Sequence, residues 1–292
     1  MLSLKKLLGW INRKLSYLPL RITIFLIRII FIPLSYVLWV LEPFVKVRFH
    51  RGQTTRLGHL TLYFETLVRS KEILLDQSVV RDIFIVQKTP ANEFLYGMWK
   101  KHFIFVESNF LDFVYHCCSG SFDSDRKHFG PLRVPHSGLL DVRPTLRFSI
   151  DEKRRGRRLL NSLGIYDTDW FVCLHNRDSA FLSKTVRGKK FTKHNLRDCK
   201  FENLIPAAKL IESKGGKAVK MSSGDGSSLD PQNNSMIIDY SGLGQTPFMD
   251  IFLPAHCKFL IGPTSGIAAV SMIFNVPIGQ TNCFHVADAV IP

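Results

Sequence analysis

The sequence lacks the short motifs that mark several well-known nucleotide and metal sites. It contains no GxxxxGK[ST] phosphate loop and no GxGxxG turn after a predicted strand, which argues against a phosphate-handling enzyme such as a pyruvyl or phosphoryl transferase. Its six cysteines form no CxxC pair, so they fit reduced, buried thiols in a cytosolic setting. No zinc-finger, RNA-recognition or helix-turn-helix signature occurs, which makes nucleic acid the weakest candidate partner.

Acidic residues are scarce relative to basic ones. The chain of 292 residues has 39 Lys and Arg residues against 24 Asp and Glu residues, a formal net charge of +15. Such an excess predicts an anionic partner, which could be nucleic acid, anionic lipid or a phosphorylated substrate. The length suggests about two domains. With 46% hydrophobic residues, each domain has enough material for a packed core.

The N-terminal segment, residues 1–44, is both basic and apolar. Its stretch 22–41 is long enough to cross a membrane, but Arg28 near the middle argues against a simple span. No small-residue cleavage site follows, as a signal peptide would require. We therefore expect a peripheral or monotopic attachment to the cytoplasmic face of the inner membrane through anionic lipid. The alternative is a hairpin packed on its own protein. The basic residues before the stretch are Lys5, Lys6, Arg13, Lys14 and Arg21.

From residue 45 onward, short apolar runs alternate with helical patterns, which predicts an α/β protein with parallel sheets covered on both faces. Residues 119–148 are rich in Gly, Pro, Ser and charge, so we expect them to link two α/β domains, 45–118 and 149–292, that frame a cleft. Ser149, with Glu152 three residues later, predicts a capping box. The expected strands are 45–49, 83–86, 104–106, 170–174, 218–221, 236–239, 258–261 and 277–279; the expected helices are 60–68, 91–101, 110–116, 149–163, 201–214, 247–256 and 267–274.

In parallel sheets ligands bind beyond the carboxyl ends of the strands, and polar residues gather at one such end. The strand 170–174 is followed by His175, Arg177, Asp178 and Ser179, and Arg197 precedes the next helix. The guanidinium of Arg177 suits phosphate oxygens. His175 could act as a general base or as a hydrogen-bond donor. The structural alternative is that Arg177 and Asp178 pair with each other, or with a helix end, and hold the loop.

A second candidate site is the turn after the strand 258–261, which contains Thr264, Ser265 and Gly266 and opens an apolar helix. The first N–H groups of a helix have no helical acceptor, and the helix dipole favours negative charge there. We therefore predict that this turn binds a diphosphate.

The turn after the first strand provides a third group of candidates, Arg56, Gly58 and His59. Gly58 would let the backbone approach a ligand closely, and His59 would enter the cleft from the opposite domain. Glu65, in the following helix, could pair with Arg56 or Arg69. The alternative for His59 is a local hydrogen bond at the helix N-terminus.

Asp250 lies within an otherwise apolar helix. Buried carboxylates are uncommon unless they have a partner, so Asp250 would either pair with a neighbour or face the cleft and bind a hydroxyl. We expect a supporting role for it rather than a catalytic one.

These blocks, in this order, resemble a family of bacterial glycosyltransferase-like proteins of GT-B fold that is associated with surface-polysaccharide synthesis. The resemblance covers most of residues 45–282 and rests on the combination of blocks rather than on one motif. The sequence departs from the family pattern at Lys220, where arginine is expected, and in the Gly-, Ser- and Asn-rich segment 222–234. The matching blocks are 56–59 with Glu65, 91–92 with Leu95, 149–164, 175–180, 203–207 with 215–216, and 249–253 leading to 264–266.

The resemblance implies two Rossmann-like domains, with the nucleotide sugar held mainly by the second domain and the acceptor by the first. It implies a hexosyl or related transferase that needs no metal or other cofactor, and no DxD motif lies between strands at a suitable position. His59 would be the general base, with His175 as the second candidate. The expected partners are a nucleotide sugar, a glycan or lipid-linked acceptor and an anionic membrane surface, without nucleic acid. The implied donor-site residues are Arg177, Asp178, Ser179, Arg197, Thr264, Ser265 and Gly266, with Arg56, Gly58, Glu65 and Asp250 in support.

Proteins of GT-B fold continue past the last predicted strand with helices that pack across the first domain, whereas this sequence stops at Pro292. We therefore expect the second domain to be incomplete. The alternative function is a catalytically inactive or truncated membrane-associated scaffold derived from such an enzyme. The sugar, the nucleotide, the acceptor and the stereochemical outcome depend on the shape of the site and stay open.

Overall fold

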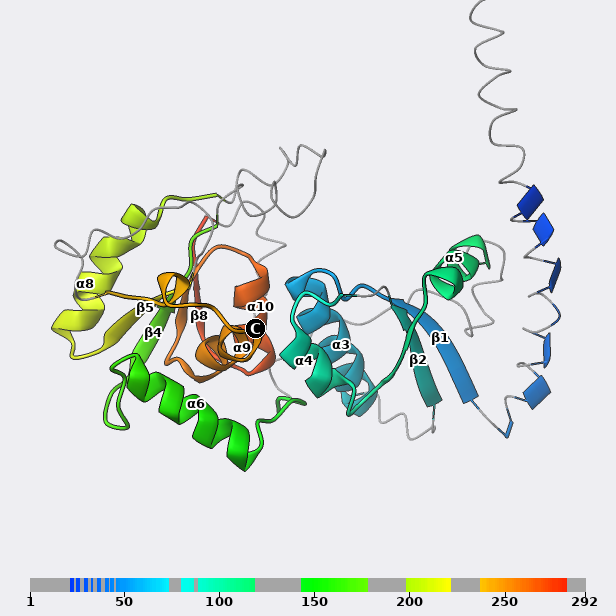
Figure 1. Ribbon diagram of the computed structural model, residues 1–292, viewed down its shortest axis with the longest axis horizontal. Coiled ribbons are helices and arrows are strands. Elements are labelled where there is room, and N and C mark those ends of the chain that lie inside the picture. The colour runs from blue at the N-terminus through cyan, green and yellow to red at the C-terminus, as the bar shows by residue number, and fades with distance from the viewer. Residues whose placement is uncertain are drawn as a thin grey trace, which may run out of the picture. The chain divides into compact units, whose positions relative to one another are not determined.

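The computed structural model describes residues 46–73, 80–86, 89–118, 143–177, 198–221 and 237–282, together with scattered positions between 22 and 44. Figure 1 shows the course of the chain. The chain forms two compact units. The first unit consists of Met1–Gln53, Gln77–Lys88 and His102–Arg133, and the second of Thr54–Asp76, Thr89–Lys101 and Val134–Pro292.

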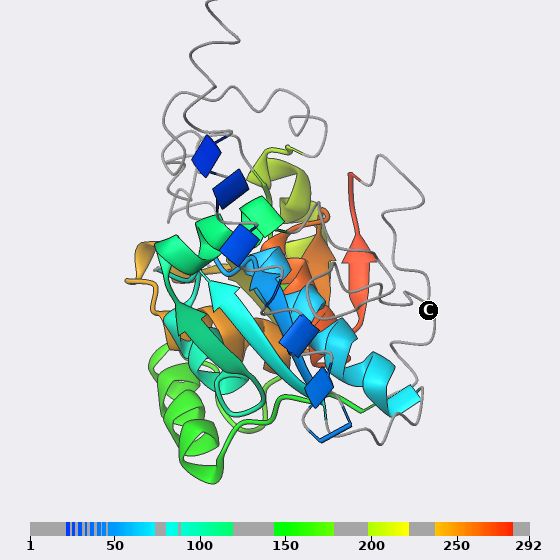
Figure 2. The ribbon, with the colours of Figure 1, turned by 90° about the vertical axis from the view of Figure 1, so that its right-hand side faces the viewer.

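The first unit contains a parallel sheet of three strands in the order β1-β2-β3, which lie side by side in Figure 2. Its core includes the buried Phe84, whose ring meets that of Phe103 edge-on at 5.0 Å. A buried His50–Asp82 pair, with Nε2 and Oδ1 2.7 Å apart, joins β1 to β2. The elements are β1 (Lys46–Gly52), β2 (Val80–Val86), β3 (Ile104–Glu107) and α5 (Asn109–Cys118).

The second unit contains a parallel sheet of five strands in the order β6-β5-β4-β7-β8. This is the strand order of a doubly wound Rossmann-like sheet, in which the direction of winding reverses next to the first strand. Here the reversal falls between β4 and β7. The prediction of parallel α/β sheets is confirmed in both units. The strands are β4 (Phe171–Leu174), β5 (Lys217–Lys220), β6 (Ile237–Asp239), β7 (Leu260–Gly262) and β8 (Ile278–Gln280).

Helices cover both faces of the five-stranded sheet, with α8 on one side and α9 and α10 on the other (Figure 1). On the α8 side, Val172 and Leu174 of β4 pack in one buried cluster with Ala208 and Ile211. The helices α3 and α4 follow strands of the first sheet in sequence, yet they group with the second unit. The helices are α3 (Leu57–Ile73), α4 (Glu93–Trp99), α6 (Ile150–Ser162), α8 (Ile205–Ser213), α9 (Pro247–His256) and α10 (Gly266–Ile273), with short 3-10 turns at Phe201–Leu204 and Tyr240–Gly242.

Local signals account for most helix boundaries. The predicted capping box is confirmed, because Ser149 Oγ accepts from Glu152 N at 3.2 Å and Glu152 Oε2 accepts from Ser149 N at 2.7 Å. The helix predicted from residue 91 begins only at Glu93, since the side chain of Asn92 accepts a hydrogen bond from Leu95 N and caps it. The helix predicted from residue 201 opens with a 3-10 turn, and α8 begins with Pro206 in its first turn, where proline is tolerated.

At the described positions between 22 and 44 the large apolar side chains are exposed. Among the residues that the structure describes, no helix is long and apolar enough to cross a membrane. Most of the N-terminal segment and residues 119–142 of the predicted linker lie outside the described residues. The exposed apolar side chains are Ile22, Phe25, Leu26, Ile29, Ile30, Tyr36, Val37, Val40, Leu41 and Phe44.

Gly156 in α6 tests how closely this helix approaches α9. A Cβ on Gly156 would lie 2.0 Å from Cζ of the buried Phe252, so we expect Gly156→Ala to lower the free energy of unfolding by about 1–3 kcal/mol. Gly97→Ala in α4 is the matched control, since an added Cβ there meets no atom within 4 Å. The control should raise stability by about 0.5–1 kcal/mol in urea unfolding. Equal effects of the two substitutions would contradict the close contact.

Candidate functional site

The candidate site begins where β4 and β7 end side by side. Leu174 pairs with Ile261, and His175 N donates a hydrogen bond of 2.9 Å to Ile261 O. Gly262 therefore lies next to His175, and a Cβ on Gly262 would be 2.6 Å from His175 O. The backbones can approach this closely only because residue 262 is glycine. The strand ends predicted to carry ligand-binding residues thus lie together, at the reversal point of the sheet.

His175 is held in a low-dielectric environment. Burial and the nearby charge of Arg177 lower the pKa of His175 from 6.5 to about 4. Its Nδ1 atom is buried and makes no hydrogen bond with any residue that the structure describes. At neutral pH this imidazole is therefore uncharged.

Arg177 is half-buried beside Asp198, with Nη1 and Oδ1 3.8 Å apart. The backbone of the same segment is fixed by Cys199, whose N donates to Arg177 O at 3.0 Å and whose O accepts from Asn176 Nδ2 at 3.2 Å. Neither Asn176 nor Asp198 was among the predicted site residues, although each is a direct neighbour in sequence of one of them. Asp178, Ser179 and Arg197 lie outside the described residues, so their roles, and the suggested Arg177–Asp178 pair, stay predictions.

The turn after β7 leads through Thr264 and Ser265 into α10. Ser265 is the N-cap residue, and its Oγ accepts a hydrogen bond of 3.2 Å from Ala268 N. This bond satisfies one of the first N–H groups of the helix, while those of Gly266 and Ile267 have no acceptor within it. The start of α10 therefore offers N–H donors and the positive end of a helix dipole to an anion.

The turn that carries His59 packs against the start of α10. A Cβ on Gly266 would lie 2.8 Å from Leu57 Cβ and 3.1 Å from Gly58 N, so glycine is required for this contact. The sequence prediction assigned His59 to the other domain, whereas residues Thr54–Asp76 belong to the same compact unit as α10. Three segments that are distant in sequence, around residues 58, 175 and 266, thus form one part of the second unit.

His59 is exposed in the first turn of α3, beside Arg56. Partial burial and the charge of Arg56 lower the pKa of His59 below 6.5. A neutral imidazole at this position can accept a proton at physiological pH.

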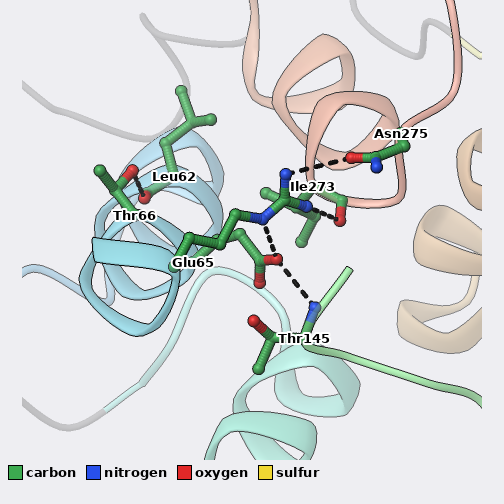
Figure 3. Close-up of polar contacts among 7 residues, drawn as sticks. Leu62, Glu65, Thr66, Thr145, Ile273 and Asn275 are labelled. Atoms are coloured by element: carbon green, nitrogen blue, oxygen red, sulfur yellow. Dashed lines mark hydrogen bonds and ion pairs between the residues drawn. The ribbon is translucent and has the colours of Figure 1, made fainter. Parts of the chain in front are cut away.

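A buried polar network, drawn in Figure 3, fixes α3 along α10. Glu65 Oε1 accepts from Arg69 Nε at 2.6 Å and from Thr145 N at 2.9 Å. Arg69 also donates to Ile273 O at 2.8 Å and to Asn275 Oδ1 at 3.1 Å, at the carboxyl end of α10. Of the two partners suggested for Glu65, the structure therefore selects Arg69. Because Gly58 meets the start of α10 and Arg69 meets its end, the two helices run side by side over the length of α10.

Asp250 lies in the first turn of α9, where its Oδ1 accepts a hydrogen bond of 3.0 Å from the Tyr240 hydroxyl. Burial raises the pKa of Asp250. It also raises the pKa of Tyr240 to about 12, with a further contribution from Asp250. The Tyr240 oxygen in turn accepts from Thr246 N at 2.8 Å. These contacts tie Asp250 to the loop before α9.

A buried cation at the end of β5 was not among the predicted site residues. Lys220 is 1% exposed; its Nζ lies 3.3 Å from Asp239 Oδ2 and 5.2 Å from the centre of the Phe201 ring. Because Lys220 pairs with Leu174 in the sheet, it lies one strand away from the residue that precedes His175. In the sequence it was noted only as the position at which the family pattern has arginine, at the end of a predicted strand. In the described part of the chain, no group of three or more His, Cys, Asp or Glu residues could hold a metal ion.

No protein-family model matches the sequence, and no curated protein matches it. Among solved structures, ADP-heptose lipopolysaccharide heptosyltransferase II from E. coli is similar with a TM-score of 0.48 and 11% identity, over 80% of this chain and 83% of that chain. A family 9 glycosyl transferase from Veillonella parvula has a TM-score of 0.45 and 12% identity, over 80% and 78%. E. coli heptosyltransferase WaaC with ADP has a TM-score of 0.39 and 10% identity, over 80% and 86%. Similarities at this level do not identify the residues or the substrate of a site.

The Arg69 network predicts a large effect of one truncation. Arg69→Ala would leave the buried Glu65 without its cation, so we expect the free energy of unfolding of the second unit to fall by about 3–5 kcal/mol. The double variant Glu65→Gln/Arg69→Met removes both charges and should lose less than the single variant in the same urea titration. A double variant that is less stable than Arg69→Ala would show that the ion pair is not the important contact.

The lowered pKa of His175 predicts acid sensitivity. Between pH 6.5 and 4 the unfolded chain binds a proton at His175 that the folded chain does not, so the contribution of this residue to stability is lost as the pH falls through that range. The loss would reach about 3 kcal/mol. In urea titrations at several pH values, His175→Gln should show a shallower decline from pH 6.5 to 4 than the unmodified chain. Parallel declines would mean that His175 is not buried as an uncharged group.

Proposed function

We propose that this chain is a glycosyltransferase that moves a sugar from a nucleotide diphosphate sugar to a glycan or lipid-linked acceptor. The observation that carries the proposal is the contact between Gly58 and Gly266, which puts the His59 turn against the start of α10. A sugar transfer needs an anion site for the leaving diphosphate and a base for the acceptor hydroxyl. The chain supplies candidates for both within one unit.

The donor diphosphate would bind at the reversal point of the five-stranded sheet. The N–H groups at the start of α10 and the Arg177 guanidinium would stabilise the negative charge that develops on it as the glycosidic bond breaks. Asp198 holds the guanidinium near the end of β4. The sequence resemblance to GT-B glycosyltransferases independently assigns these segments to the donor site.

His59 is the proposed general base, because its lowered pKa keeps it neutral and its exposure makes it accessible to an acceptor. His175 is the second candidate, and its burial beside Gly262 suits it better to a hydrogen bond with the donor. We further propose that the transfer needs no metal ion, so chelation with EDTA should leave it unchanged.

We also propose that residues 1–44 attach the chain to the cytoplasmic face of the inner membrane without crossing it. The exposed apolar side chains at the described positions between 22 and 44 support this, as do the basic residues around them in the sequence. Attachment would keep the proposed active site near a lipid-linked acceptor.

Thermal unfolding of the full chain in detergent, with a panel of nucleoside diphosphates and their sugars, tests the donor site. We expect one nucleoside diphosphate family to raise the Tm, because a ligand that binds only the folded state stabilises it. Arg177→Ala should weaken that binding by about tenfold or more, since hydrogen bonds to charged groups contribute about 1.5–3 kcal/mol. The control Arg81→Ala removes an exposed arginine of β2 and should bind normally. No Tm shift with any nucleotide, from a folded chain that still binds vesicles, would favour the scaffold alternative.

The role of His59 is tested with the donor so identified, by following radiolabelled sugar into lipid-extractable products. His59→Ala should lower the transfer rate by about 10²–10⁴-fold while leaving donor binding intact, as expected for a general base. His102→Ala, at another exposed histidine, is the control. Near-normal transfer by His59→Ala would show that His59 is not the general base. It would not contradict the proposed donor site.

A further inference from the structure

The segment that contains α6 concentrates the positive charge of the chain. Residues 143–162 contain seven Lys and Arg residues and two Asp and Glu residues, so a fifteenth of the chain's length carries an excess of five of its +15 charges. The basic residues are Arg143, Arg147, Lys153, Arg154, Arg155, Arg157 and Arg158, and all seven are exposed. None of them belongs to the proposed donor or acceptor site.

The rotation of α6 about its axis is fixed by its inner face. Gly156 lies directly against the Phe252 ring, where a Cβ would be only 2.0 Å away, and Leu160 on the same face is buried. At one edge of the contact the Arg155 guanidinium lies 4.4 Å from the centre of the Phe248 ring. The helix cannot turn without losing these contacts, so one defined face points outward.

That outward face combines cations with an apolar side chain. Residues 150, 154 and 158 are spaced four apart on the side of the helix away from Gly156 and Leu160, with Lys153 and Arg157 at its edge, and Ile150 is 71% exposed. Arg154 and Arg157 have exposed partners, Asp151 at 3.3 Å and Asp167 at 2.8 Å, and exposed pairs of this kind contribute little to stability. Lys153 and Arg158 have no ion-pair partner among the residues that the structure describes.

We infer that the outward face of α6 rests on an anionic phospholipid surface. Lys and Arg side chains can reach phosphate groups while their stems, and Ile150, lie against the apolar boundary. Single-stranded nucleic acid, the main alternative polyanion, is bound largely by stacking on aromatic side chains, and α6 contains none. The inference concerns a different unit from the N-terminal segment, and it does not depend on the proposed transfer reaction.

The test uses the full chain and vesicles of phosphatidylcholine, with and without phosphatidylglycerol. Lys153→Gln/Arg158→Gln removes two exposed cations of α6 that have no ion-pair partner among the described residues. Lys209→Gln/Lys214→Gln, at exposed positions on and just after α8, removes the same charge elsewhere. We expect the first double variant to partition about tenfold less onto vesicles with phosphatidylglycerol, since each basic residue near an anionic surface contributes several-fold. Its partitioning onto pure phosphatidylcholine should stay unchanged. The control variant Lys209→Gln/Lys214→Gln should partition onto both kinds of vesicle as the unmodified chain does.

Three results would overturn the inference. Normal partitioning of Lys153→Gln/Arg158→Gln would show that α6 does not contact lipid. An equal loss in both double variants would mean that only net charge matters. Unchanged vesicle binding with lost binding to single-stranded DNA would assign the surface to nucleic acid instead. Binding of nucleotide sugars, measured on the same variants by Tm, separates these outcomes from a failure of the proposed function.

Discussion

The buried guanidinium of Arg69 is the interaction on which the candidate site depends most. An arginine that is 1% exposed is costly to remove from water unless its donors find acceptors, and Glu65, Ile273 O and Asn275 supply them. Two of these acceptors lie at the carboxyl end of α10, where a cation also complements the helix dipole. The guanidinium therefore fixes α3 on α10, and with it the turn that carries His59.

Close backbone contacts then complete the site at the other end of α10. Gly266 allows the start of this helix to touch Gly58, and Gly262 allows the end of β7 to touch His175. A side chain at either glycine would push these segments apart by several tenths of an ångström or more. The geometry of the site thus depends on two small residues at one end of α10 and on one large buried cation at the other. These contacts bring the start of α10 against the histidine turn and the end of β7 against the end of β4.

The helices and strands could be predicted from the sequence, but the contacts between distant elements could not. Strands such as β4 and helices such as α6 follow from apolar runs and from a capping box within a few residues, so local physics decides them. The packing of α3 on α10 joins residues about two hundred positions apart, and no local pattern encodes it. Arg177 likewise has Asp198 beside it, across a stretch that the sequence showed only as a polar loop. Ser265, predicted as a phosphate ligand, is also the cap of its own helix.

The basic excess of this chain divides into two physically different groups. Arg69, Lys220 and Arg177 each lie close to a carboxylate and are shielded from solvent, so salt screens their interactions only weakly. The cations of α6 face water, and their contacts with any anionic surface fall off within a Debye length of about 8 Å at physiological ionic strength. Added salt should therefore release the outward face of α6 from a charged surface long before it loosens the network that holds α3 on α10. Net charge alone could not distinguish these groups, because burial and nearby carboxylates decide which cations remain available to a partner.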